Sequence, residues 1–274
     1  MLRFFQNIWI AACLVRNFPS LVGAYWFAKP GRETVYHLRN GLSVKLRDRT
    51  ADFRILREVF YHRSYERPPF SVKKGDVVVD IGAHIGLFAL QAAHVAGAGR
   101  VIAVEPMPDN FRILKENAEV NGASALALVQ CAVAPQSGEF NFYVHPDNTA
   151  GHSMRAVTAG ARKISVRAAS LADVMSEWAV SRIDFLKMDC EGTEDELLRS
   201  FSDDLFSRIS TIALEYHEEL GVSPSRLAEF LRSRGYEVRT VPPMIYARRA
   251  ADGKVSQGFD NGRATTPCTH RPIV

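Results

Sequence analysis

The sequence predicts an α/β fold built on a doubly wound, mostly parallel β-sheet. From Asp76 onward, short apolar segments alternate with amphipathic segments of helical period, which is typical of parallel strands joined by crossover helices. The first apolar segment is rich in valine and ends in a glycine-containing turn directly before a helix. The chain has 274 residues, 47% of them hydrophobic and 23% charged. This suits one such domain with additions and excludes disordered and low-complexity proteins.

Each core strand is expected where a β-branched or apolar run lies between turn residues. The predicted strands span residues 76–81, 100–104, 126–130, 183–188 and 211–215, and residues 236–241 close the sheet. The predicted helices span residues 87–95, 108–121, 170–178, 194–200 and 224–234, with Pro108, Ser170 and Ser223 at their starts.

An antiparallel hairpin is predicted as an addition to this sheet. Residues 139–144 alternate apolar and polar side chains, and residues 163–167 form a second short strand. The segment 147–160 between them is rich in Gly, Ser, Thr and Asn, so we expect a mobile loop there.

The chain divides into three predicted regions. Residues 1–70 are expected to be a helical or extended segment that packs on the core, and residues 71–245 form the α/β domain. Residues 246–274 are polar and glycine-rich, and are expected to be an irregular tail.

The N-terminal segment is unusually aromatic. Its longest unbroken apolar run, Ile8–Val15, is far shorter than the roughly 20 residues that span a bilayer. A helix packed on the domain is the favoured interpretation. The alternative is an amphipathic segment that makes peripheral contact with a membrane through Trp9, Phe18, Tyr25 and Trp26.

The formal charge of +4 conceals basic flanks around an acidic centre. Residues 1–75 carry 14 basic and 5 acidic residues, residues 76–245 carry 15 and 23, and the remainder carries 5 and 2. Basic flanks can dock on membrane surfaces or acidic partners, but a solvated face is the simpler interpretation.

The cysteines indicate a reducing compartment. Four of them are widely spaced and form no CxxC pair: Cys13, Cys131, Cys190 and Cys268. This pattern disfavours a disulfide scaffold or a zinc knuckle and predicts a cytoplasmic protein.

The first predicted strand ends in a turn suited to a nucleoside cofactor. Gly82 and Gly86 let the backbone approach a ligand closely, and Glu105 follows the second strand, where a carboxylate can bind both ribose hydroxyls. His84 stands where a dinucleotide motif, GxGxxG, has its second glycine. Asp80 would face a diphosphate unfavourably but suits the ammonium and sulfonium groups of S-adenosylmethionine (SAM). SAM is therefore favoured over NAD.

A second group of chemically active residues follows the fourth and fifth core strands. Lys187, Asp189 and Glu191 lie at the tip of one strand, and Glu215 and His217 at the tip of the other. Acidic residues at a helix N-terminus are explained by the helix dipole, whereas Asp189 ends an apolar strand and needs another explanation. Such a cluster can hold a hydroxyl acceptor and take its proton, or bind a divalent cation.

These motifs resemble those of the FkbM-type SAM-dependent methyltransferases. The resemblance is carried by residues 80–86, 104–106, 183–194 and 213–215 and covers about residues 70–240. It implies a class I, Rossmann-like methyltransferase fold. It also implies methylation of hydroxyl groups on sugars or polyketide-derived natural products, the reaction of most members with an assigned activity. His84 departs from the asparagine usual in the family, but its backbone matters most, so SAM binding is expected to survive.

Roles follow from this resemblance. The expected cofactor-binding residues lie in three turns: Asp80, Gly82, His84, Gly86, Glu105, Cys131 and Ala132. The first turn would hold the methionine end, Glu105 the ribose, and Cys131 and Ala132 the adenine. Asp189 is the candidate base or acceptor anchor, supported by Lys187 and Glu191.

The sequence therefore predicts a SAM-dependent O-methyltransferase that acts on a hydroxyl of a sugar or natural-product-like small molecule. The alternatives are a SAM-binding module without catalytic activity and an NAD-dependent oxidoreductase. A nucleic-acid partner is not expected, because Asp-Cys-Glu-Gly follows the fourth strand in place of Asn-Pro-Pro-Tyr. A divalent cation held by Asp189, Glu215 and His217 could lower the pKa of the acceptor hydroxyl. The identity of the acceptor and the oligomeric state are left open.

Overall fold

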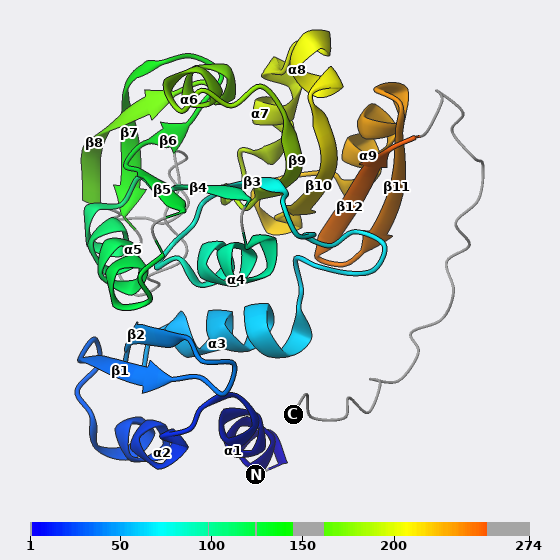
Figure 1. The fold of residues 1–274 in the computed structure, drawn as a ribbon. Coiled ribbons are helices and arrows are strands. Elements are labelled where there is room, and N and C mark those ends of the chain that lie inside the picture. The colour runs from blue at the N-terminus through cyan, green and yellow to red at the C-terminus, as the bar shows by residue number, and fades with distance from the viewer. Residues whose placement is uncertain (1, 98, 124, 145–161, 251–274) are drawn as a thin grey trace.

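A central sheet runs through the computed structural model, which describes residues 2–97, 99–123, 125–144 and 162–250. Within these ranges, seven strands pair in the order β11–β12–β10–β9–β3–β4–β5 (Figure 1). The parallel strands of this sheet are β3 (Val77–Ile81), β4 (Arg100–Val104), β5 (Leu126–Val129), β9 (Ile183–Met188) and β10 (Ile209–Glu215). The chain order reverses between β3 and β9, and such a switch point is where open α/β sheets bind ligands.

Helices cover both faces of the sheet (Figure 1). On one face lie α4 (Leu87–Ala96) and α5 (Pro108–Val120), and on the other α6 (Leu171–Glu177), α7 (Glu194–Ser200), α8 (Asp203–Ser207) and α9 (Pro224–Ser233). Successive residues of β3 enter opposite cores, Val78 on the side of α4 and Val79 on the side of α7. Burial on both faces explains why the core strands are continuous apolar runs. The predicted fold class is confirmed.

The predicted antiparallel hairpin is also present. β7 (Gly138–Val144) pairs antiparallel with β8 (Arg162–Ala169), which pairs in parallel with the short β6 (Ala132–Val133). The expected mobile loop, 147–160, lies outside the described residues.

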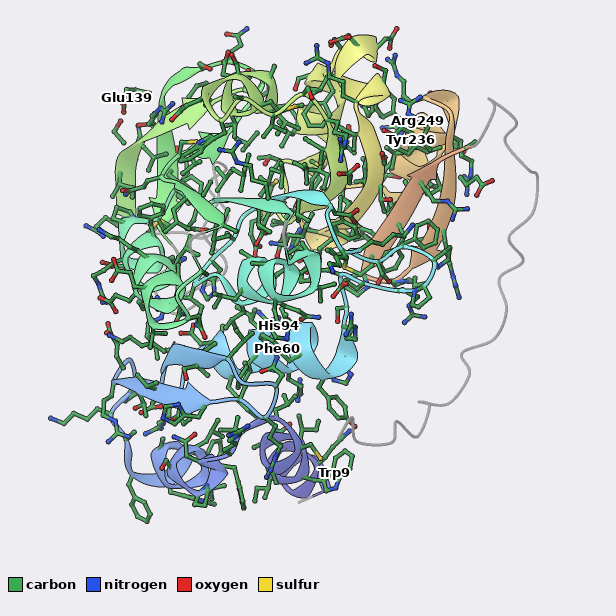
Figure 2. All side chains as sticks on the ribbon, in the orientation of Figure 1. Trp9, Phe60, His94, Glu139, Tyr236 and Arg249 are labelled. Atoms are coloured by element: carbon green, nitrogen blue, oxygen red, sulfur yellow. The ribbon has the colours of Figure 1, made fainter. Side chains whose placement is uncertain are left out.

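The predicted C-terminal boundary is wrong. Residues 244–249 form β12 (Met244–Arg249), which lies between β10 and β11 (Tyr236–Val241) and pairs antiparallel with both. The irregular tail therefore does not begin at Tyr246, whose ring is 1% exposed. The guanidinium of Arg249 lies 5.2 Å from the centre of the Tyr236 ring (Figure 2). Charged residues on this strand thus cover apolar surface. Residues 251–274 lie outside the described residues.

The N-terminal segment forms a separate layer beside α4 and α5 (Figure 1). Its elements are α1 (Leu2–Leu14), α2 (Phe18–Phe27), an antiparallel hairpin of β1 (Glu33–His37) and β2 (Ser43–Arg47), α3 (Asp52–Leu56) and the π-helical turn η1 (Arg57–His62). Two asparagines hold β2, one within α5 and one directly after that helix. Asn117 accepts a hydrogen bond from the Lys45 amide (2.6 Å), and Asn121 donates to the Ser43 carbonyl (2.7 Å). In the described part of the chain, no helix combines the length and apolarity needed to cross a membrane.

Candidate functional site

A cavity opens at the carboxyl ends of β3, β4, β9 and β10. Its volume of about 290 Å³ is close to the lower end of the range for small-molecule sites, roughly 300–1000 Å³. Most residues expected at the site line this cavity: Gly82, His84, Glu105, Cys131, Ala132, Lys187, Asp189, Glu191, Glu215 and His217. Asp80 and Gly86 do not line it.

The turn after β3 needs glycine for two different reasons. A Cβ on Gly82 would lie 2.0 Å from the carbonyl oxygen of Asp189, so the end of β9 can pass here only against a glycine. A Cβ on Gly86 would lie 2.2 Å from a methyl carbon of Leu114. Gly86 therefore allows α4 to pack on α5, and it does not line the cavity. Both glycines have positive φ, 74° and 85°.

Glu105 is held at the end of β4 by its surroundings. Its Oε2 accepts a hydrogen bond from the His84 amide (2.8 Å), and its Oε1 accepts one from the Met107 amide (2.9 Å). Burial raises the pKa of Glu105 to about 6, in spite of these hydrogen bonds. The carboxylate thus faces the cavity in a fixed orientation, ready to accept hydrogen bonds from a ligand.

His84 joins the cavity to the N-terminal layer. Its Nε2 lies 3.0 Å from Nη2 of Arg47, the last residue of β2, and 3.8 Å from Oδ1 of the buried Asp52. Its backbone carries a positive φ of 53°. The side chain that departs from the family pattern is therefore engaged with the N-terminal segment.

Asp80 and Lys187 form a buried ion pair beneath the cavity. Lys187 Nζ lies 3.0 Å from Oδ1 of Asp80, and the two side chains are 4% and 0% exposed. The same ammonium donates to the Gly82 carbonyl (2.7 Å) and lies 4.0 Å from Asp189. Burial works to lower the pKa of Lys187, but the charges of Asp80 and Asp189 outweigh it and raise that pKa. Asp80 is thus paired with Lys187 below the cavity wall, and its contact with the methionine end of a cofactor stays a prediction.

Tyr65 brings together the acids at the tips of β9 and β10. Its hydroxyl lies 2.9 Å from Oδ2 of Asp189 and 2.7 Å from Oε2 of Glu215. A phenol has one hydrogen to donate, so the two carboxylates share it. Burial and the charge of Asp189 raise the pKa of Glu215 to about 7. Glu215 therefore takes up a proton far more readily than an exposed glutamate does.

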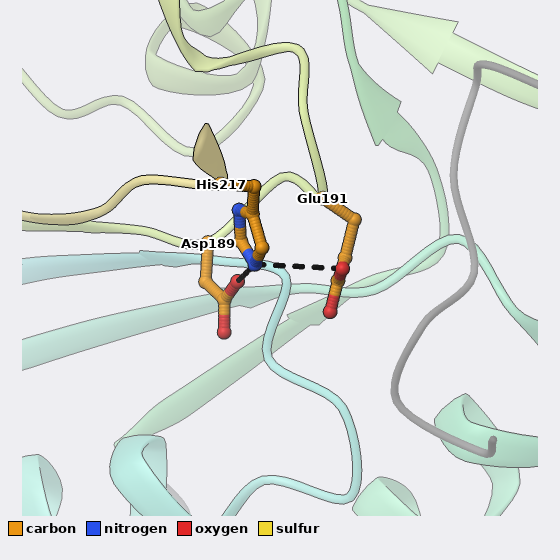
Figure 3. Close-up of side chains that lie close together, drawn as sticks. All are labelled: Asp189, Glu191 and His217. Atoms are coloured by element: carbon orange, nitrogen blue, oxygen red, sulfur yellow. Dashed lines mark ion pairs between the residues drawn. The ribbon is translucent and has the colours of Figure 1, made fainter. Parts of the chain in front are cut away.

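His217 lies among three carboxylates, and two of them, Asp189 and Glu191, are drawn with it in Figure 3. Its Nδ1 donates to Oε1 of the fully buried Glu194 (2.9 Å), and its Nε2 lies 3.4 Å from Glu191 and 3.9 Å from Asp189. Burial works to lower the pKa of His217, but Glu194 and the neighbouring acids raise it to about 10. Burial and the charge of Asp189 raise the pKa of Glu191 to about 8.

The predicted set of metal ligands needs correction. Asp189, Glu191 and His217 each place one ligand atom within 4.8 Å of the others. In the described part of the chain, this is the group of side chains that could hold a metal ion. Glu215 is outside this group because its carboxylate turns to Tyr65. The sequence analysis named Glu191 only as a support for Asp189.

Several lining residues were not expected. Tyr65, Arg54 and Glu58 belong to the N-terminal segment, and Phe142 belongs to β7. The basic charge of residues 1–75 and the alternation of β7 were visible in the sequence. Neither feature showed that these elements fold back over the strand ends.

Comparison with known families gives one match that spans most of the sheet. The model of the family described as "Methyltransferase FkbM domain" matches residues 80–238. This range includes the turn after β3, Glu105 and the cavity residues at the tips of β9 and β10.

Two curated relatives are similar over most of their own length. The 31-O-demethyl-FK506 methyltransferase FkbM of Streptomyces tacrolimicus is 30% identical over 248 residues, covering 80% of this chain and 91% of that protein. Methyltransferase sdnD of Sordaria araneosa is 26% identical over 215 residues, covering 67% of this chain and 82% of that protein.

Solved structures are similar at lower identity. A precorrin-6y C5,15-methyltransferase from Geobacter metallireducens GS-15 is 19% identical with a TM-score of 0.40, covering 65% of this chain and 82% of that one. A SAM-dependent methyltransferase from Aquifex aeolicus is 14% identical with a TM-score of 0.41, covering 72% and 98%.

The pKa of Glu215 predicts how stability depends on pH. It is about 7 in the folded chain against an ordinary value of 4.5, so ionisation of Glu215 disfavours the folded state. The contribution of Glu215 to the free energy of unfolding is fully present below about pH 4.5 and is lost as the pH rises through about 7. Glu215→Gln still accepts from Tyr65 but carries no charge. At about pH 8 it should raise the free energy of unfolding by about 1–3 kcal/mol.

Urea unfolding of the ligand-free chain at acidic and at alkaline pH measures this effect. The variant and the wild type should have the same stability near pH 4. Glu219→Gln is the matched control, because Glu219 lines the same cavity but is exposed. A gain from Glu215→Gln that is equal at both pH values contradicts the assignment.

Proposed function

Since this chain belongs to the FkbM-domain methyltransferase family and is a SAM-dependent methyltransferase, we propose that it methylates a hydroxyl group of a sugar or natural-product-like small molecule. The family membership removes the NAD-dependent oxidoreductase from consideration. The observation that carries the proposal is Asp189, a carboxylate at the tip of a core strand that lines the cavity and is 21% exposed.

The residues of the cavity fit SAM. Glu105 is buried and fixed by two backbone amides, and it is suited to accept hydrogen bonds from the ribose hydroxyls. Gly82 lets the end of β9 pass directly against the turn after β3, which places Asp189 on the cavity wall. Cys131, Ala132 and Phe142 offer apolar surface for the adenine. When bound, SAM supplies a methyl group activated by a sulfonium ion.

We assign Asp189 as the base that takes the acceptor's proton. The hydroxyl of Tyr65 holds Oδ2 of Asp189 in place, and Nζ of Lys187 lies 4.0 Å from the same oxygen. At neutral pH a protonated Glu215 can donate to Tyr65, and Tyr65 can then donate to Asp189. This hydrogen bond fixes the Asp189 carboxylate at the cavity, and a general base must be positioned in this way. Tyr65 is therefore a positioning residue.

The N-terminal segment is proposed to select the acceptor. Arg54 and Glu58 form an ion pair (2.9 Å) on the cavity wall, and Ile55 and Val59 add apolar surface to this wall. A wall with charged and apolar parts suits an acceptor that carries several polar groups on a carbon frame. The name of the Streptomyces relative, which describes a 31-O-demethyl substrate, supports transfer to an oxygen atom.

Metal-assisted transfer is a second candidate. Asp189, Glu191 and His217 could hold a divalent cation, because Glu194 accepts the Nδ1 hydrogen of His217 and a neutral imidazole would then direct its Nε2 lone pair toward the two acids. An imidazole ligand favours Mn²⁺ or Zn²⁺ over Mg²⁺. The cation would lower the pKa of the acceptor hydroxyl.

Loss of the Glu105 charge should weaken cofactor binding. Glu105→Gln should reduce the affinity for SAM by about 1–3 kcal/mol, because hydrogen bonds to a charged acceptor are lost. Isothermal calorimetry with SAM measures the effect, and Glu219→Gln serves as the control. An unchanged affinity in a folded Glu105→Gln chain would remove Glu105 from the cofactor site.

Asp189→Asn should lower turnover and spare cofactor binding. The amide keeps the shape of the side chain but cannot act as a base, so turnover should fall by about 100-fold or more. The assay follows S-adenosylhomocysteine release with a panel of sugars and polyketide-derived alcohols as acceptors. An equal fall in SAM affinity would place Asp189 in the cofactor site. Wild-type protein that binds SAM but turns over no acceptor would favour the non-catalytic module.

Metal removal separates the two candidate mechanisms. The metal-assisted mechanism requires that exhaustive EDTA treatment abolish turnover, that Mn²⁺ restore it, and that Glu191→Gln raise the Mn²⁺ concentration needed. Turnover that is unchanged by EDTA eliminates the metal and leaves Asp189 as the base.

A further inference from the structure

Large aromatic side chains are exposed on the first two helices. The side chains of Trp9, Tyr25, Trp26 and Phe27 are 57%, 58%, 60% and 89% exposed, and we call these four residues the aromatic patch. Figure 2 shows Trp9 on α1, in the layer furthest from the central sheet, and α2 packs against α1 in that layer. Exposed apolar groups of this size usually mark an interaction surface.

The position of Phe18 differs from the sequence-based expectation. It is half-buried and packs against the core shared with α4 and α5. Phe27, which the sequence analysis did not single out, is the most exposed of the large apolar side chains. The patch is therefore formed by the end of α2 and by one residue of α1.

The charged residues in the stretch of chain that carries the patch are all basic. No acidic residue precedes Glu33 in the chain, whereas Arg3, Arg16, Lys29 and Arg32 are basic. Arg16 and Lys29 flank α2 and are exposed. Exposed Trp and Tyr beside the exposed Arg16 and Lys29 have the composition of a surface that lies at an anionic membrane interface.

The patch is held in place by the N-terminal hairpin. Arg39 donates to the carbonyl of Ala12 (2.8 Å), and Asn17 donates to the carbonyl of Val35 (3.2 Å) and accepts from the amide of His37 (2.9 Å). α1 is further tied to η1 by an edge-to-face contact between Trp9 and Tyr61. The helices are thus ordered before they meet a partner, so binding does not have to include their folding.

We propose that the aromatic patch docks the protein on the surface of a membrane that contains anionic lipid. Trp26, Phe27 and Tyr25 enter the interface, while Arg16 and Lys29 lie at the level of the lipid headgroups. This proposal does not depend on the reaction that the cavity catalyses. The contact is peripheral, because burial of the patch requires no membrane-spanning helix.

Vesicle sedimentation of the full chain tests this proposal. The protein should pellet with vesicles of phosphatidylcholine and phosphatidylserine, and much less with phosphatidylcholine alone or at high salt. Trp26→Ser with Phe27→Ser should lower the partition coefficient by at least about tenfold. Val120→Ser is the matched control, because Val120 is 55% exposed but lies at the end of α5.

Tryptophan fluorescence locates the contact. The chain has three tryptophans, Trp9, Trp26 and Trp178, and Trp178 packs on the other face of the sheet. A Trp178→Phe chain should show a blue shift with anionic vesicles. A chain with Trp9→Phe and Trp26→Phe should show none. Circular dichroism checks that each variant is folded.

Two results would overturn the proposal. One is sedimentation that is independent of phosphatidylserine and of the serine substitutions. The other is a stable dimer by light scattering that Trp26→Ser with Phe27→Ser converts to a monomer, because the patch would then be covered by a second copy of this chain.

Discussion

The ion pair between Lys187 and Asp80 is the interaction on which the site depends. It joins β9 to β3 at the switch point of the sheet, and both side chains are almost fully withdrawn from solvent. The same ammonium binds the carbonyl of Gly82 and lies 5.0 Å from the centre of the Tyr65 ring. One cation thus holds the glycine turn, the end of β9 and the N-terminal segment. Removing one half of such a pair typically costs about 3–5 kcal/mol, because the other charge stays buried.

The commitment of Lys187 to Asp80 determines the chemistry of the cavity. Asp189, Glu191 and Glu215 are crowded at the strand tips, and burial together with the charge of Asp189 raises the pKa of Glu191 and of Glu215 to about 8 and about 7. His217 offsets part of this charge as a cation held by Glu194. A site of this kind favours a ligand that brings positive charge or donates hydrogen bonds. A sulfonium and a hydroxyl group are such ligands.

The sequence predicted most of the sheet, because burial on both faces of parallel strands makes continuous apolar runs. It did not predict β12, since Arg248 and Arg249 give that strand a polar end, although β12 forms a tight hairpin with the preceding β11. The site residues at the strand tips were found from their positions after β3, β4, β9 and β10. The roles of Asp80 and Glu215 could not be found in this way. They depend on Lys187 and on Tyr65, and the chain from Tyr65 to Glu215 spans 150 residues.

Calorimetry of cofactor binding near pH 7 in buffers of different ionisation enthalpy tests the central claim, that SAM binds beside the crowded acids. A sulfonium should lower the pKa values of Glu191 and Glu215, so SAM should bind with release of protons. S-adenosylhomocysteine has a neutral thioether and should bind with clearly smaller release. Equal proton release with both ligands would contradict the account, as would the absence of binding to either.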